Sequence, residues 1–157
     1  MEKTIAISDY ELERGKPMPS KLHSRVQSNI NFLLQSNYRE RYDVLSELNL
    51  ELDGWGSVPD LCVYPKMDYD FSEDEIRMTT APLCTIEILP PTQSLQELID
   101  KAYHYFGHGV KSCWLVIPAL KNIYVFSGRE TYQISKSNET LTDASIGVTL
   151  PLSEIFK

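Results

Sequence analysis

The stretch LCTIEILPPTQSLQELIDKAYHYFGHG, residues 83–109, decides the fold class because it joins a strand directly to a helix. The apolar run from Leu83 to Leu89 predicts a strand, which Pro90-Pro91 ends. Ser94 and Glu97 then match a capping box, in which two side chains satisfy free backbone amides at a helix start. The expected apolar face of this helix consists of Leu95, Leu98, Ile99, Ala102 and Phe106.

Further strands are expected downstream of this unit. The run from Cys113 to Ile117 is apolar throughout and predicts a strand that is buried on both faces. Residues 123–126 predict the next strand, and two weaker strands are expected near 131–134 and 147–150.

Upstream of the same unit, Ser20 can cap a helix that ends near Asn37. The apolar face of that helix is expected to contain Leu22, Val26, Ile30, Leu33 and Leu34. The strict alternation from Leu48 to Leu52 predicts a half-buried strand, and Asp53-Gly54 predicts a turn after it. Residues 58–64 predict another strand, and the acidic residues 68–75 predict an exposed loop.

The order of these elements predicts an α/β (α+β) fold with a mixed central β-sheet flanked by helices. A length of 157 residues predicts one domain, 1–157. The longest apolar run is too short to cross a bilayer, and no signal-peptide layout is present, so we expect a cytoplasmic protein. Cys62, Cys84 and Cys113 all lie in apolar runs, which predicts buried reduced thiols.

The net charge of −7 argues against a protein that binds nucleic acid by bulk charge. Binding to DNA would therefore need a local basic surface. The candidates are Arg39 and Arg41, together with Lys21 and Arg25. The alternative for each of these residues is a solvated helix face or turn.

Two carboxylates interrupt strand-like segments. Asp60 precedes an apolar run, and Glu87 lies between two isoleucines. An ionised group beside the core costs several kcal/mol unless it is paired or bound to a metal. The alternative for Glu87 is a solvated strand face shared with Thr85 and Leu89.

Lys101 lies at the boundary of the apolar stripe of the helix that follows Glu87. Glu97 and Tyr105 are four residues to either side, so all three share one edge of the helix. A helix that folds back along its strand would let Lys101 reach the carboxylates. The alternative is a surface ion pair between Glu97 and Lys101.

Several short motifs carry a family resemblance. In chain order they are Val58-Pro59-Asp60, TIEILPPT at residues 85–92, the Glu97, Lys101 and Tyr105 spacing, Gly109-Val110 and Trp114-Leu115-Val116. Together they resemble the Uma-type family of bacterial proteins described as "putative restriction endonucleases", in the PD-(D/E)XK nuclease-like superfamily. Tyr10-Glu11-Leu12-x-x-Gly15 and His23 resemble its opening motif.

The resemblance implies a restriction-endonuclease-like core in which two acids hold a divalent metal and a lysine assists. Asp60 and Glu87 would be the metal ligands, with Mg²⁺ or Mn²⁺ as the cofactor. The lysine usually found two residues after the second acid is replaced here by Leu89, so Lys101 would take that role. Glu11 would be an added acid at the edge of the site. The resemblance also implies a homodimer with DNA as the substrate.

The chain departs from the family pattern at three positions. Pro90 stands where a serine is common, Glu97 where an aspartate is usual, and Lys16 where an acid often follows the opening glycine. The three residues Asp60, Glu87 and Lys101 are retained.

Two functions are therefore expected as alternatives. The first is a metal-dependent endonuclease that hydrolyses phosphodiester bonds in DNA with Asp60, Glu87 and Lys101 as catalytic residues. The second is a non-catalytic interaction domain on the same fold, which acts through protein partners or self-association. The retained acids and lysine favour the first, and the acidic overall charge favours the second.

Overall fold

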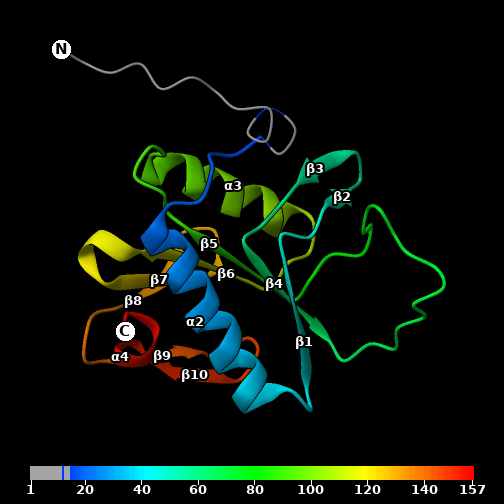
Figure 1. Ribbon diagram of the computed structural model, residues 1–157. Coiled ribbons are helices and arrows are strands. Elements are labelled where there is room, and N and C mark those ends of the chain that lie inside the picture. Colours follow the sequence, from blue (N-terminus) through cyan, green and yellow to red (C-terminus); the bar gives the residue numbers. More distant parts are fainter. Residues whose placement is uncertain (1–11, 13–14) are drawn as a thin grey trace.

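A six-stranded mixed sheet forms the centre of the computed structural model, which describes Leu12 and residues 15–157 (Figure 1). The predictions for Tyr10 and Glu11 therefore lie outside the described residues. The strand order is β1-β4-β5-β6-β7-β8. These strands span Tyr42–Ser46, Leu61–Pro65, Cys84–Ile88, Ser112–Ile117, Asn122–Gly128 and Thr131–Ser135, respectively.

Only the central pair of strands, β5 and β6, is parallel. All other neighbours in the sheet are antiparallel. A parallel pair needs a crossover connection, and the helix α3 (Leu95–Gly107) supplies it. The Ser94 hydroxyl accepts a hydrogen bond from the Glu97 amide at 3.3 Å, which confirms the predicted helix start.

Two layers cover the two faces of the sheet (Figure 1). One face packs against α2 (Lys21–Tyr38), the hairpin of β9 (Thr140–Asp143) and β10 (Val148–Pro151), and the short helix α4 (Leu152–Ile155). The other face packs against α3 and the hairpin of β2 (Leu50–Leu52) and β3 (Trp55–Ser57). A 3-10 turn, Pro118–Leu120, links β6 to β7.

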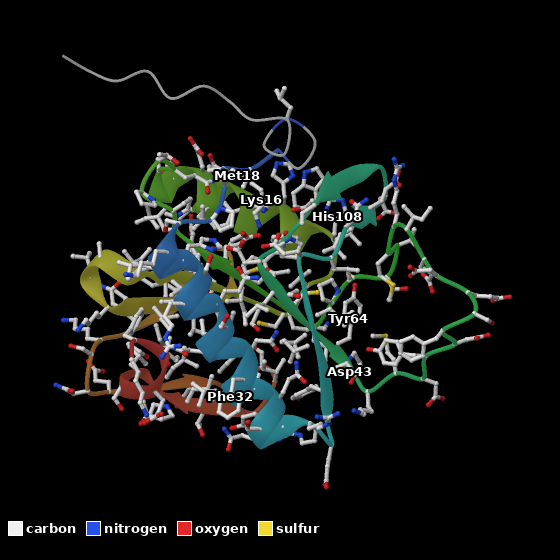
Figure 2. The ribbon with its side chains drawn as sticks, in the orientation of Figure 1. Lys16, Met18, Phe32, Asp43, Tyr64 and His108 are labelled. Atoms are coloured by element: carbon white, nitrogen blue, oxygen red, sulfur yellow. The ribbon has the colours of Figure 1, made fainter. Side chains whose placement is uncertain are left out.

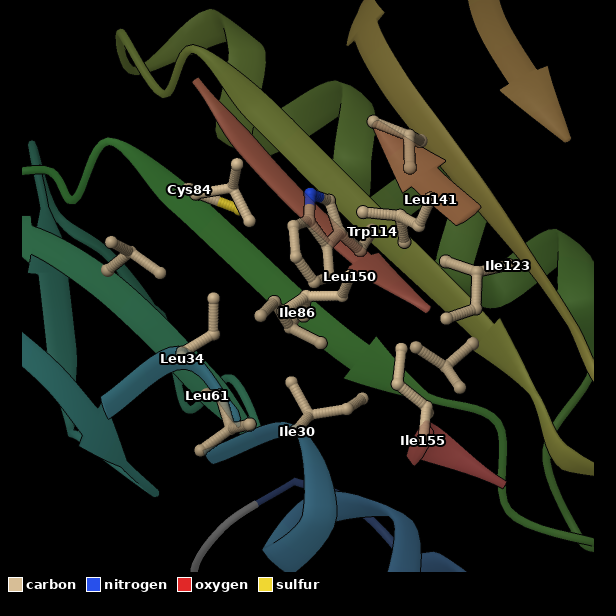
Figure 3. Close-up of a cluster of buried hydrophobic side chains, with 14 of the residues drawn as sticks. Ile30, Leu34, Leu61, Cys84, Ile86, Trp114, Ile123, Leu141, Leu150 and Ile155 are labelled. Atoms are coloured by element: carbon tan, nitrogen blue, oxygen red, sulfur yellow. The ribbon is translucent and has the colours of Figure 1, made fainter. Parts of the chain in front are cut away.

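The alternation of side chains along β5 and β6 builds both cores. Ile86 and Trp114 point into the α2 face, whose apolar cluster is drawn in Figure 3. Cys113 and Leu115 point into the α3 face. Every residue of β6 is buried, as its apolar sequence predicts. Because Ile86 faces α2, its neighbour Glu87 faces α3.

The sequence predicts the fold class correctly, and several details differ. The strand β1 was not predicted, and of Leu48 to Leu52 only the last three residues form a strand. Leu22 lies on the exposed side of α2 and is 61% exposed. The strand β9 was also missed, because its hairpin with β10 turns at residues 144–147, a segment without a strong hairpin signal. All three cysteines are buried and free, as predicted.

Asp143, at the end of β9, is a structural carboxylate. It is 1% exposed, and its Oδ2 accepts a hydrogen bond from the Trp114 indole nitrogen at 2.7 Å. Its Oδ1 accepts one from the Ser145 amide at 3.0 Å. The Oδ2 atom of Asp143 thus supplies the acceptor that the buried Trp114 indole needs.

We expect Asp143→Ala to lower the free energy of unfolding by about 3 kcal/mol, because it leaves the buried Trp114 donor without its acceptor. Urea unfolding followed by tryptophan fluorescence measures this loss. The matched control is Asp74→Ala in the exposed acidic loop, expected to change stability by less than about 0.5 kcal/mol. Equal losses in the two variants would contradict this role for Asp143.

Candidate active site

A cavity of about 70 Å³ lies where the start of α2, the end of β5 and the middle of α3 meet. It has room for several water molecules but not for a nucleotide. Five charged or titratable side chains line it: Lys16, His23, Asp60, Glu87 and Lys101. The cavity therefore contains all three residues that the sequence predicts as catalytic.

Asp60 precedes β4 directly and is 1% exposed. Its Oδ1 lies 2.5 Å from the Lys16 Nζ. Its Oδ2 accepts a hydrogen bond from the Ile88 amide at 2.7 Å and lies 3.1 Å from the His23 Nε2. Burial opposes ionisation, but the His23 hydrogen bond and the Lys16 charge outweigh it and lower the pKa of Asp60 to about 2.

Glu87, in the middle of β5, lies on the side of the sheet that faces α3 and is 5% exposed. Its Oε1 pairs with the Lys101 Nζ at 2.8 Å and accepts a hydrogen bond from the Tyr105 hydroxyl at 3.3 Å. Burial raises the pKa of Glu87, and the nearby charge of Asp60 adds to the rise, although Lys101 opposes it. The solvated strand face considered for Glu87 is wrong, because Thr85 is fully buried as well.

The helix α3 holds Lys101 and Tyr105 one turn apart on the edge that faces Glu87. The Tyr105 ring is fully buried, and its hydroxyl lies 2.6 Å from the hydroxyl of Ser57. The single hydrogen of the Tyr105 hydroxyl is donated to Glu87, so in the second bond the Ser57 hydroxyl is the donor and the Tyr105 oxygen the acceptor. Glu97, the third residue of the predicted edge, is exposed, and Lys101 pairs with Glu87.

Lys16 enters the site from the irregular segment before α2, beside α3 in the view of Figure 2. Its ammonium contacts Asp60, the Val58 carbonyl at 3.2 Å and the Glu47 Oε2 at 3.2 Å. Burial opposes its charge, but the charges of Asp60 and Glu87 outweigh the burial and raise the pKa of Lys16. Gly15, with a φ of +66°, allows the sharp turn that precedes Lys16.

Three contributors to the site were not predicted as site residues. His23 falls on the same helical stripe as Val26, Ile30 and Leu34, and a histidine on a buried stripe is a signal that could have found it. Lys16 lies in an irregular segment, where no periodicity indicates which way a side chain points. The alternation up to Leu52 predicted a solvated strand position for Glu47, which lies instead in the irregular segment between β1 and β2.

The donor set suits a hard divalent cation. Asp60 and Glu87 present carboxylate oxygens to one cavity, and Mg²⁺ and Mn²⁺ prefer oxygen ligands. Within the described part of the chain, no group of three or more His, Cys, Asp or Glu side chains is positioned to hold a metal. Among the side chains that line the cavity, Asp60 and Glu87 are the two carboxylates that could hold such a cation, with water completing the coordination as Mg²⁺ usually requires.

His104 and His108 serve a packing role outside this cavity. His108 caps the C-terminus of α3. Both imidazole rings stack on Trp55, and the distance between ring centroids is 5.0 Å for His104 and 5.3 Å for His108.

The four basic candidates separate to the two ends of α2. Lys21 lines a groove of about 440 Å³ that shares His23, Pro90 and Gln93 with the cavity. Arg39 and Arg41 lie at the other end of this 18-residue helix, about 25 Å away. Arg25 lies on the first turns of α2, where its Nε donates a hydrogen bond to the Lys157 carbonyl at 3.1 Å. Of the four candidates, Lys21 is therefore the one that lines the groove next to the cavity. No described helix combines the length and the apolar character needed to span a membrane.

Comparison with known proteins gives one family and one fold. The model of the Uma2 family, described as "Putative restriction endonuclease", matches residues 2–153. No protein with a curated description matches the chain. A crystal structure from Anabaena variabilis ATCC 29413, described as a "putative nuclease belonging to DUF820", has the same fold with a TM-score of 0.77. The two sequences are 24% identical, and the match covers 89% of this chain and 83% of that chain.

Proposed function

The chain belongs to the Uma2 family, described as "Putative restriction endonuclease", and from this premise we propose that its cavity is the active site of a metal-dependent DNA endonuclease. Asp60 and Glu87 are the proposed ligands of Mg²⁺ or Mn²⁺, and Lys101 is the proposed third catalytic residue. One observation supports this most: the Lys101 ammonium lies 2.8 Å from Glu87 in the cavity that Asp60 also lines.

Each side chain has a distinct role in this proposal. When bound, the metal polarises a phosphate oxygen and lowers the pKa of a coordinated water. Lys101 orients the attacking water or neutralises charge that builds on the phosphate oxygens. Tyr105 holds Glu87 in place through its hydroxyl, and Ser57 holds Tyr105 in turn.

The surroundings of the cavity decide how a nucleic acid would approach. A cavity of about 70 Å³ admits water and phosphate oxygens but excludes a base. The adjoining groove, which Lys21 lines, offers a positive charge next to the cavity. We propose that the substrate backbone lies along this groove, with Lys21 as a phosphate contact.

The proposal predicts that cleavage of supercoiled plasmid depends on a divalent metal. Chelation with EDTA is expected to reduce the cleavage rate at least about a thousandfold, because metal activation of water and phosphate supplies several kcal/mol. Gel assays on plasmid, single-stranded DNA and RNA, with Mg²⁺ or Mn²⁺, measure the rate and the preferred substrate. No cutting of any substrate, together with no metal-induced rise in melting temperature, would reject the nuclease.

The non-catalytic interaction domain is the second candidate. It is supported by the Lys16–Asp60 ion pair, because an ammonium already neutralises the first acid without a metal. Metal binding by the purified protein separates the two candidates. The homodimer implied by the family resemblance stays a prediction, and sedimentation velocity is its direct test.

A further inference from the structure

We propose that Lys16 is a tethered counter-ion that competes with the divalent metal for Asp60, so that metal enters only when the Lys16 ammonium leaves. This inference rests on the proposed function above. It means that Lys16, a residue of the chain itself, controls whether a metal ion binds at the proposed site.

The Lys16 ammonium already occupies a cation position made of oxygens. It contacts the Asp60 Oδ1 at 2.5 Å, and the Val58 carbonyl and the Glu47 Oε2 at 3.2 Å each. Its side chain is 10% exposed, and that of Asp60 is 2% exposed. Carbonyl and carboxylate oxygens around one positive charge are the surroundings that Mg²⁺ also takes.

The second oxygen of Asp60 is not available as an alternative. Oδ2 accepts a hydrogen bond from the Ile88 amide and contacts the His23 Nε2. Both partners belong to regular elements, β5 and α2, that hold them in place. A metal that binds Asp60 therefore has to use Oδ1, where the ammonium lies.

The ammonium and the metal cannot share Oδ1, because two positive charges at such a distance repel strongly in a buried site. Lys16 is able to leave without unfolding a helix or a strand, and the charge of the entering metal would compensate Asp60 in its place. Its backbone belongs to no helix or strand, so moving the side chain breaks no regular backbone hydrogen bond. A lysine head on four methylene groups reaches solvent by rotation of its own side chain.

Metal titration of Lys16→Gln is the first test. Isothermal titration with Mn²⁺ should show at least about tenfold tighter binding than in the wild type, because one buried positive charge is removed. Lys111→Gln, which alters an exposed lysine outside the cavity, should bind Mn²⁺ like the wild type. Equal or weaker binding in Lys16→Gln, or no binding in either protein, would overturn the inference.

Lysine labelling of the wild type is a second test, which does not depend on the variant folding. An acylating reagent with peptide mass spectrometry should modify Lys16 slowly without metal, because Lys16 is buried and paired. Saturating Mn²⁺ should speed the modification of Lys16 at least about tenfold. The reason is that metal binding displaces the Lys16 ammonium and so raises the fraction of molecules in which it is exposed to the reagent. Lys111 should be modified at the same rate in both conditions, and a Lys16 rate that metal leaves unchanged would count against displacement.

The failure of this inference can be distinguished from failure of the proposed function. Tighter metal binding by Lys16→Gln without cleavage by any form supports the tethered counter-ion and rejects the nuclease. The opposite outcome is metal-dependent cleavage by the wild type together with equal Mn²⁺ affinity in the wild type and Lys16→Gln, or weaker affinity in Lys16→Gln. That outcome supports the nuclease and rejects the counter-ion.

Discussion

Glu87→Gln is expected to abolish metal binding and reduce DNA cleavage at least about a thousandfold, while leaving the protein as stable as the wild type or more stable. The loss follows from the removal of one of two carboxylate ligands. The stability follows from burial, since Glu87 is 5% exposed and its pKa is raised. At pH values between its ordinary pKa and the raised folded pKa, the folded state holds a proton that the unfolded chain has lost. The stability contribution of Glu87 therefore falls as pH rises through that range.

The neutral glutamine removes this unfavourable ionisation and keeps an oxygen that can accept from Tyr105. Plasmid cleavage, Mn²⁺ titration and urea unfolding at neutral pH measure the three quantities. The matched variant is Lys101→Ala, which should lose cleavage by about a hundredfold or more and still bind metal. Lys101→Ala losing metal as completely as Glu87→Gln would contradict the separate roles. A fully active Glu87→Gln would remove Glu87 from the site.

Asp60→Ala is expected to lower the free energy of unfolding by about 3–5 kcal/mol, the range seen when one partner of a buried ion pair is removed. The buried Lys16 ammonium would lose its closest partner, and the Ile88 amide and the His23 ring would lose an acceptor. Urea unfolding measures the loss. The double variant Asp60→Ala/Lys16→Met should recover part of it, because the uncompensated charge is gone. No recovery in the double variant would show that Lys16 and Asp60 do not interact in solution.

The loss in Asp60→Ala should also depend on pH in a defined direction. The pKa of Asp60 is lowered to about 2 in the folded state, and an ordinary aspartate titrates near 3.9. Its contribution is therefore complete above about pH 4 and is lost as pH falls toward 2. The difference in stability between wild type and Asp60→Ala should shrink over that interval. A constant difference down to pH 2 would show that packing, not charge, accounts for it.

A loss of DNA cleavage therefore has a different meaning in Asp60→Ala than in Glu87→Gln. A loss in Asp60→Ala would combine unfolding with the loss of a ligand, because Asp60 also joins β4, β5 and α2 through its contacts. A loss in Glu87→Gln reports on the chemistry alone if the protein stays folded. Glu87 is for this reason the sharper test of the proposed nuclease.

The regular elements that carry the site were predictable from local signals. The apolar run that becomes β5, the double proline that ends it and the Ser94 cap fix a strand followed by a helix. That unit places Glu87 on the strand and Lys101 on the helix that returns along it. The sequence pattern thus led to the pair that the structure joins at 2.8 Å.

The fold class was predictable from the amino-acid sequence, because periodicity and capping are local properties of the chain. The order of its short motifs indicated the family, and the resemblance to that family in turn implied the two acids and the lysine of the candidate site. Only the tertiary structure decided that Glu87 points away from solvent, since burial depends on which layer covers that face of the sheet. It alone decided that Lys16 lies on Asp60, 44 residues away in the chain. In an irregular segment no helical or strand periodicity predicts the direction of a side chain, so the packing of the surrounding elements determines which residue it contacts.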